Sequence, residues 1–162
     1  MLNYNKKISI IIPCFNEEKT LYKLISKIHR QGLPYKEIIL VDDCSNDGTK
    51  KIIKNFKPSF VDKIYFHKKN KGKGACIKTA KKYLDGDIVI IQDADLEYDP
   101  KDYKKLILPI LQKEYKVVYG SRVLGKNRYN MKNFSSIYRI FFNHILTLFS
   151  NLINRQKLTD AH

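Results

Sequence analysis

Two aspartates, Asp93 and Asp95, follow directly from the apolar run DIVIIQ (87–92) in the stretch IIQDADLEYDP. Because side chains alternate along an extended segment, both carboxylates point the same way. Adjacent carboxylates repel each other unless a cation lies between them, and Mg²⁺ or Mn²⁺ accepts such ligands together with substrate phosphates. The spacing therefore favours a divalent-metal site. The alternative is a solvated acidic turn that caps the next helix, a role that suits Asp99 before Pro100.

A second acidic pair, Asp42 and Asp43, ends the apolar run EIILV (37–41). Carboxylates at this position could accept hydrogen bonds from a base NH or from ribose hydroxyls. The following Asp47 and Gly48 are typical of a turn, in which Asp47 caps the next helix. This stretch therefore combines candidate ligand-binding acids with one acid that we expect to be structural.

Three further motifs give weaker signals. PCFNEE (13–18) offers Asn16 and Glu17 for a site, although acids also suit a helix start. NKGKGACIKTA (70–80) places two glycines and two lysines ahead of a helix, where backbone NH groups attract phosphate, but its spacing is not that of a P-loop. Arg122 in GSR could hold a phosphate or carboxylate, although a single arginine is more often a surface residue.

Each of these motifs follows a predicted strand. Apolar, β-branched runs predict strands at 8–12, 37–41, 63–67, 87–92 and 116–120, with Pro13 ending the first. Apolar spacing and caps predict helices from Leu21 to Ile28 and over 49–56, 74–84 and 100–112. This alternation indicates an α/β fold with a mostly parallel central sheet and helices on both faces. Ligands of such sheets bind at the carboxyl ends of the strands, where the polar motifs lie.

The chain of 162 residues has a formal net charge of +15, and its length predicts a single domain over 1–162. The charge favours anionic partners, but acids at the strand ends would repel nucleic acid, so we expect no nucleic-acid partner. Three widely spaced cysteines predict a reduced, cytoplasmic chain without structural zinc. No segment reaches the roughly 18 to 20 uninterrupted apolar residues that a membrane-spanning helix needs.

Taken in order, IIPCFNEE, VDDCSNDGT, NKGKGACIKTA, QDADLEYDP and VVYGSR resemble the motifs of family-2 glycosyltransferases. The nearest branch is that of the dolichyl- and polyprenyl-phosphate sugar synthases. The resemblance covers residues 7–160 and implies a GT-A (Rossmann-like) fold and an inverting transfer from a UDP- or GDP-sugar. It also implies dependence on Mg²⁺ or Mn²⁺ and a polyprenyl-phosphate acceptor at the cytoplasmic face of a membrane.

Position by position, the resemblance implies a role for each candidate residue. The metal ligands would be Asp93, Asp95 and Glu97. The nucleotide-sugar pocket would contain Pro13, Phe15, Glu17, Asp42, Asp93, Ala94, Asp95 and Arg122. The catalytic residues would be Asp95, Arg122 and Asp160. Asp160 would act as general base if the acceptor is a hydroxyl, whereas an acceptor phosphate is already anionic and needs no strong base.

The resemblance is incomplete at Asp160, in LTDAH, which matches the start of a Thr-Asp-x-x-Thr-Cys-Tyr-Lys-like segment. We therefore expect a GT-A domain lacking the usual C-terminal portion. The alternative function is a non-catalytic nucleotide-sugar-binding remnant. The apolar stretch 135–153, if helical, could lie in a membrane interface or pack into a core. A nucleic-acid-binding module and a nucleotidyltransferase are less well supported, because the sequence lacks their signature motifs.

Overall fold

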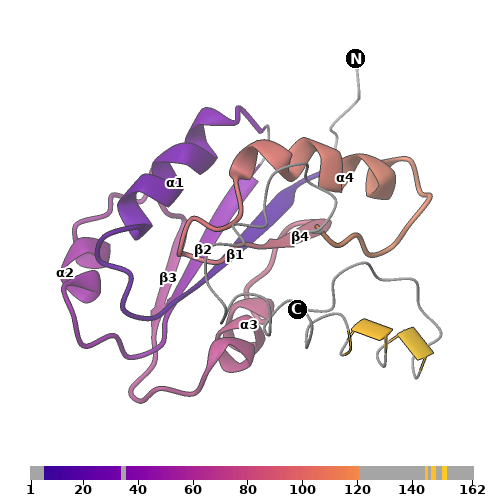
Figure 1. The fold of residues 1–162 in the computed structure, drawn as a ribbon. Coiled ribbons are helices and arrows are strands. Elements are labelled where there is room, and N and C mark those ends of the chain that lie inside the picture. The colour runs from indigo at the N-terminus through magenta and orange to yellow at the C-terminus, as the bar shows by residue number, and fades with distance from the viewer. Residues whose placement is uncertain (1–5, 34–35, 121–144, 146, 149–150, 153–162) are drawn as a thin grey trace, which may run out of the picture. The chain divides into compact units, whose positions relative to one another are not determined.

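The computed structural model describes residues 6–33, 36–120, 145, 147–148 and 151–152. The chain forms two compact units, Met1–Ile107 and Leu108–His162. Strands and helices alternate through the first unit (Figure 1). They are β1 (Ile8–Cys14), α1 (Leu21–Arg30), β2 (Lys36–Asp42), α2 (Thr49–Lys54), β3 (Lys63–Phe66), α3 (Lys73–Lys81), β4 (Ile88–Ile91) and the 3₁₀ turn η1 (Pro100–Asp102). The helix α4 (Tyr103–Leu111) follows directly.

The sheet is parallel and has the strand order β3-β2-β1-β4. In β1, Ile8 is paired with Lys36 of β2 on one side and with Ile88 of β4 on the other. The chain thus adds β2 and β3 on one side of β1 and then returns to add β4 on the other side. The carboxyl ends of β1 and β4 therefore form the topological switch point, the place where ligands bind in open α/β sheets.

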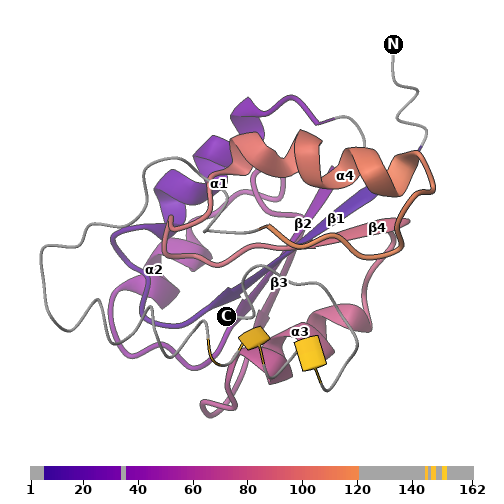
Figure 2. The same ribbon diagram turned by 45° about the vertical axis from the view of Figure 1, so that its right-hand side comes forward.

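Helices pack on both faces of this sheet, as predicted. Figures 1 and 2 show α1 and α3 on opposite sides of the strands. The α1 side chains at helical spacing are completely buried: Leu21, Leu24, Ile25 and Ile28. On the other face, Cys76 and Ala80 of α3 pack against Ile11, Ile39 and Val41. The two layers hold β1, whose residues are buried throughout, rigidly in the centre.

A buried polar network fastens the sheet at the end opposite the acidic motifs. Glu37 of β2 is almost completely buried, and it accepts hydrogen bonds from the Ser9 hydroxyl and the Asp85 backbone NH. The ammonium of Lys63 lies 3.0 Å from the same carboxylate. Burial acts to raise the pKa of Glu37, but the hydrogen bonds from Ser9 and Asp85 outweigh it and leave the pKa below its ordinary value.

Two strand predictions are wrong in detail. Pro13 does not end β1, which continues to Cys14 with Pro13 in register opposite Val41. The pairing of β1 with β4 ends at Ile11, so a residue without an NH group is tolerated at Pro13. Residues 116–120 are irregular rather than a strand. An apolar run meets the pattern of a strand, but a strand also needs a backbone partner, and no pairing with 116–120 occurs in the described part of the chain.

The segment 135–153 is described only at Ile145, Thr147, Leu148, Asn151 and Leu152, all of which are helical. Among the residues that the structure describes, no helix is both long and apolar enough to cross a bilayer. The rest of this segment lies outside the described residues. The same holds for two predicted catalytic residues elsewhere in the chain, Arg122 and Asp160.

Candidate active site

A pocket with a volume of about 240 Å³ lies at the switch point of the sheet. Its walls come from the end of β1 and the loop after it, the loop after β4, the residue after β2 and the start of α3. The lining residues are Pro13, Cys14, Phe15, Glu17, Asp43, Lys73, Cys76, Asp93, Ala94 and Asp95. The structure therefore brings together the predicted residues from the first and fourth strand ends, although nearly 80 residues separate them in the sequence.

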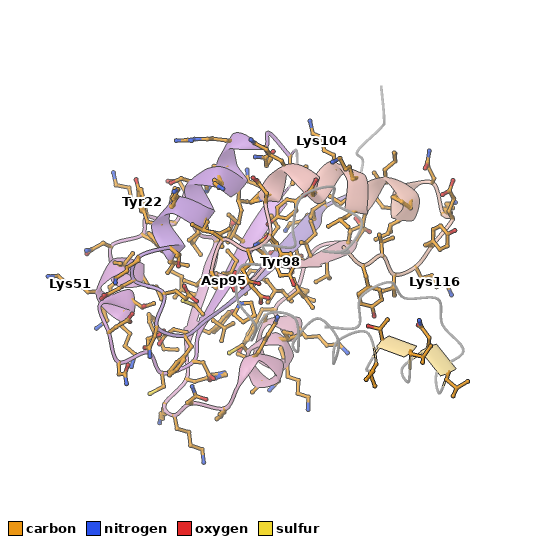
Figure 3. All side chains as sticks on the ribbon, in the orientation of Figure 1. Tyr22, Lys51, Asp95, Tyr98, Lys104 and Lys116 are labelled. Carbon is orange, nitrogen blue, oxygen red and sulfur yellow. The ribbon has the colours of Figure 1, made fainter. Side chains whose placement is uncertain are left out.

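A buried glutamine holds the loop after β4 in place through hydrogen bonds to the loop backbone. The side-chain amide of Gln92 donates to the carbonyls of Asp93 at 2.9 Å and Tyr98 at 3.2 Å. The hydroxyl of the buried Tyr103 donates to Gln92 Oε1 at 2.8 Å. Figure 3 shows Asp95 and Tyr98 near each other in this loop. The acidic turn is therefore fixed to the core, which keeps its carboxylates in one place.

The acids of this turn differ in their hydrogen bonds. Asp99 Oδ1 accepts from the Lys101 NH at 3.1 Å, which confirms its predicted role as a helix cap. Asp95 is exposed, and its Oδ1 accepts from the Glu97 NH at 3.0 Å. Leu96 has a positive φ of 68°, a conformation that costs energy for a residue with a side chain. Strain of this kind next to Asp95 is often found at functional sites.

The loops after β1 and β2 are joined to each other. The backbone NH of Asn16 donates to Ser45 Oγ at 2.9 Å, and that of Glu17 donates to Thr49 Oγ1 at 2.8 Å. Asn16 and Cys44 both have positive φ angles, of 57° and 65°. The predicted cap also forms here, since the Thr49 NH donates to Asp47 Oδ1 at 2.9 Å. The loop after β1, which forms one wall of the pocket, is thus held in place by hydrogen bonds to the loop after β2.

Asp42 and Asp43 have different positions. Asp42, the predicted nucleotide contact, is completely buried, and its Oδ2 accepts from the Ser45 NH at 3.2 Å. Its Oδ1 has no hydrogen-bond partner among the described residues, so this atom remains a candidate acceptor for a ligand donor. Asp43 lines the pocket instead. The sequence offered both acids but gave no means of telling which one reaches the cavity.

Asp43 binds the loop between β3 and α3. Its carboxylate accepts from the backbone NH of Lys71 at 3.0 Å, from that of Gly72 at 2.6 Å and from His67 Nδ1 at 2.6 Å. Burial acts to raise the pKa of Asp43, but these hydrogen bonds outweigh it, and the pKa lies below its ordinary value. The NH groups of Lys71 and Gly72 therefore serve a protein carboxylate, rather than the phosphate that their position before a helix suggested.

Lys73 is a pocket residue that sequence reasoning did not single out. It is the first residue of α3, and its Nζ lies 2.6 Å from Asp93 Oδ1 and 2.7 Å from Asp93 Oδ2. The only signal in the sequence was that NKGKG contains two lysines, and the fold decides which of them reaches the acids. Because Asp93 already binds one cation, this corner of the pocket is suited to positive charge.

One group of three metal-ligand side chains exists among the described residues, and it is not the predicted one. It consists of Asp43, His67 and Cys76, whose ligand atoms lie within 4.8 Å of one another. Burial, followed by the charge of Asp43, raises the pKa of the Cys76 thiol to about 11, so the thiol is protonated at neutral pH. Metal binding by Asp93, Asp95 and Glu97 remains a prediction, and Glu97 does not line the pocket.

Fold and pocket together define an α/β protein with a pocket at the switch point of its sheet, lined by Asp93 and Asp95. The pattern of "Glycosyl transferase family 2" matches residues 9–160, and the chain belongs to that family. Its fold is accordingly the predicted GT-A fold. The comparisons thus confirm the predicted family and fold class.

Two curated relatives bear the names of transferases that act with dolichyl or dolichol phosphate. The chain is 34% identical to a UDP-N-acetylglucosamine–dolichyl-phosphate N-acetylglucosaminyltransferase of Methanococcus voltae, over 80% of this chain and 56% of that protein. It is 37% identical to a dolichol-phosphate mannosyltransferase of Pyrococcus furiosus, over 62% of this chain and 29% of the relative. The chain therefore spans little more than half the length of the first of these relatives and less than a third of the second.

Solved structures also resemble this chain. A mannosyltransferase from Pyrobaculum calidifontis, determined with GDP-Man and Mn²⁺, superimposes with a TM-score of 0.56 at 27% identity. The match covers 62% of this chain and 30% of the mannosyltransferase.

Proposed function

We propose that this chain binds a UDP- or GDP-linked sugar at the switch-point pocket and supports its inverting, metal-dependent transfer to a polyprenyl phosphate. The observation that carries the proposal is the meeting of Phe15 and Glu17 with Asp93 and Asp95 in one cavity. An aromatic ring and carboxylates at the carboxyl ends of parallel strands suit a ligand with a flat base, ribose hydroxyls and a diphosphate.

The donor site would divide along the pocket. Phe15 is 43% exposed and offers a ring face to the nucleobase. Pro13, Glu17 and the Ala94 backbone would complete the nucleoside contacts. Asp42 stays a predicted nucleotide contact, and its buried Oδ1 has no hydrogen-bond partner among the described residues. The Lys73 ammonium, which binds Asp93, would also attract the diphosphate, because the two groups carry opposite charges.

The residues present fit a hard divalent cation. Asp93 and Asp95 supply carboxylate oxygens, and Mg²⁺ or Mn²⁺ commonly binds one or two carboxylates together with substrate phosphates. When bound, such an ion would neutralise the charge of the diphosphate leaving group. Glu97 and the catalytic roles of Arg122 and Asp160 stay predictions from the family resemblance.

The transfer itself would be a single displacement. A phosphate oxygen of the acceptor would form a bond to the anomeric carbon while the bond from that carbon to the diphosphate oxygen breaks, which inverts the configuration. The acceptor is already anionic, so no general base is required. The relatives from Methanococcus voltae and Pyrococcus furiosus bear the names of transferases acting on dolichyl phosphate or dolichol phosphate, which supports a polyprenyl-phosphate acceptor for this chain.

Calorimetric titration with UDP and with GDP, in Mn²⁺ and in chelator, tests the donor site. We expect one nucleotide to bind only with Mn²⁺, and Asp95→Ala to weaken that binding at least about tenfold. Asp99→Ala is the matched control. Asp99 lies in the same acidic stretch, but its side chain caps η1 by accepting from the Lys101 NH. If neither nucleotide binds wild type under any condition, or if both variants behave alike, the proposal is wrong. Binding without transfer to polyprenyl phosphate would instead support the nucleotide-sugar-binding remnant.

A further inference from the structure

We propose that His67 is a positioning residue of the donor pocket, which acts through Asp43 on the loop that carries Lys73. His67 is the residue directly after β3 and does not line the pocket. Neither the motifs nor the family resemblance drew attention to it. The effect on nucleotide binding rests on the proposed function, whereas the effect on the loop does not.

His67 is buried between two elements and uses both ring nitrogens. Its side chain is 7% exposed, and that of Asp43 is 4% exposed. Nδ1 lies 2.6 Å from Asp43 Oδ1, and Nε2 lies 2.9 Å from the Thr79 hydroxyl of α3. Because an ionised carboxylate only accepts, Nδ1 carries the proton and donates to Asp43, while Nε2 shares a hydrogen bond with the Thr79 hydroxyl. The ring is therefore held in one orientation from both sides.

The orientation of His67 fixes the Asp43 carboxylate, and that carboxylate in turn fixes the loop. Asp43 accepts from the NH groups of Lys71 and Gly72, the last two residues before α3. Gly72 has a φ of 83°, a backbone conformation that glycine adopts without strain. The next residue is Lys73, whose ammonium binds Asp93. A continuous series of contacts thus runs from the buried imidazole to a charged group in the pocket.

Removing the imidazole would leave the Asp43 carboxylate with two backbone donors, Lys71 and Gly72, and without a side-chain donor. A buried carboxylate that loses one hydrogen bond either rotates toward another donor or admits water, and both changes displace the Lys71 and Gly72 NH groups. The expected consequence is a loop that opens more often and a Lys73 that spends less time over the diphosphate position.

A metal site at Asp43, His67 and Cys76 is the competing explanation for the same cluster. The hydrogen bonds argue against it, because both Asp43 oxygens already accept from NH groups and His67 Nδ1 already donates to one of them. The Cys76 thiol, with its raised pKa of about 11, would also have to lose a proton to bind metal. The positioning role requires none of these changes.

The test compares four variants of the full chain. His67→Leu removes both hydrogen bonds, whereas His67→Asn retains an NH donor close to the Nδ1 position. Thr79→Val removes only the partner of Nε2. His29→Leu is the matched control. His29 is a partly buried histidine of α1 that does not line the pocket, and its Nε2 lies 2.9 Å from the Phe60 carbonyl oxygen. The readouts are amide hydrogen exchange at Lys71 and Gly72, nucleotide affinity with Mn²⁺, and thermal unfolding.

We expect His67→Leu to accelerate exchange at Lys71 and Gly72 and to weaken nucleotide binding about tenfold, the scale typical of residues that orient a ligand group. His67→Asn should recover most of both effects, and Thr79→Val should show a smaller loss. His29→Leu should lower thermal stability without changing either readout. If His67→Leu does not fold, Thr79→Val still decides, because it frees the ring on the Nε2 side and should change both readouts more than His67→Asn does; a Thr79→Val protein identical to wild type in both readouts would then overturn the inference.

Unchanged exchange and unchanged affinity in a folded His67→Leu protein would overturn the inference. Faster exchange with unchanged affinity would also overturn it, since the loop would then not serve the donor. If wild type binds no nucleotide, the proposed function fails, and amide exchange alone decides whether His67 positions the loop. Zn²⁺ is the final probe: tight binding of Zn²⁺ that is lost in Cys76→Ala would assign the cluster to a metal instead.

Discussion

Lys73 Nζ lies within 2.7 Å of both carboxylate oxygens of Asp93 in the switch-point pocket. The lysine side chain is 55% exposed and that of Asp93 is 26% exposed, so the pair lies at the mouth of the cavity rather than in the core. An ion pair in this position is weak enough to exchange partners when a ligand arrives. It also means that a metal ion approaching Asp93 competes with a cation that the protein supplies itself.

Lys73→Met should therefore increase the affinity of the nucleotide-free protein for Mn²⁺. The competing ammonium is removed, and exposed ion pairs contribute up to about 1 kcal/mol, which corresponds to an increase of about fivefold at most. The measurement is a titration of free Mn²⁺ by electron paramagnetic resonance. Lys105→Met, which removes an exposed lysine paired with Asp102 at 3.0 Å, is the control and should have no effect. Equal Mn²⁺ affinity in all three proteins would contradict the competition.

Phe15→Ala should weaken nucleotide binding without a large loss of stability. Stacking of a base on an aromatic ring contributes about 1–3 kcal/mol, and the exposed Phe15 ring makes little core contact to lose. Calorimetry in Mn²⁺ measures the change. Phe66→Ala is the matched control, because Phe66 is 44% exposed, against 43% for Phe15, and lies at the end of β3 outside the pocket. A similar loss in both variants would place the base elsewhere.

Asp43→Asn should lower the free energy of unfolding at pH 7 by about 1–3 kcal/mol, and the deficit should shrink in acid. The pKa of Asp43 is below its model-compound value of 3.8, so the unfolded state binds more protons as the pH falls toward and below that value. The stabilisation is fully present above the unfolded-state pKa and is lost as the pH falls through the folded one.

Urea denaturation of wild type and Asp43→Asn between pH 7 and pH 3 measures this difference. The control is Asp102→Asn, an exposed acid whose replacement should change stability by less than about 0.5 kcal/mol throughout. A deficit for Asp43→Asn that stays constant with pH would show that the carboxylate charge is not what stabilises the loop.

Gly86→Ala should destabilise the protein by about 1–3 kcal/mol, because its new methyl group would lie 2.7 Å from the Ser9 backbone nitrogen and 3.0 Å from the Lys7 carbonyl oxygen. These are backbone atoms at the start of the central strand, and they cannot move without disturbing the Glu37 network. Gly74→Ala provides a comparison of opposite sign, since nothing lies within 4 Å of the added carbon in α3. It should be neutral or stabilising by up to about 1 kcal/mol. Thermal unfolding of the two variants checks both signs.

The sequence by itself determined the order of the elements and several of the residues that line the pocket. Buried β-branched runs and apolar residues at helical spacing predicted every strand of the sheet and the helices between them, because local periodicity reports which face is buried. Asp93 and Asp95 were identified because polar residues directly after buried strands lie at one edge of a parallel sheet. Phe15 was identified only through the family resemblance. The capping roles of Asp47 and Asp99 are equally local, and the structure confirms both.

Only the tertiary structure decided which residues meet. It placed Asp43 in the lining of the pocket and buried Asp42 outside that lining, although the two are adjacent in sequence, because successive side chains at a strand end point to different sides. It brought Lys73 to Asp93 across 20 residues and His67 to Asp43 across 24, contacts for which no spacing rule exists. The failed prediction at 116–120 has the same origin. A strand is completed by a partner elsewhere in the chain, and local sequence carries no information about that partner.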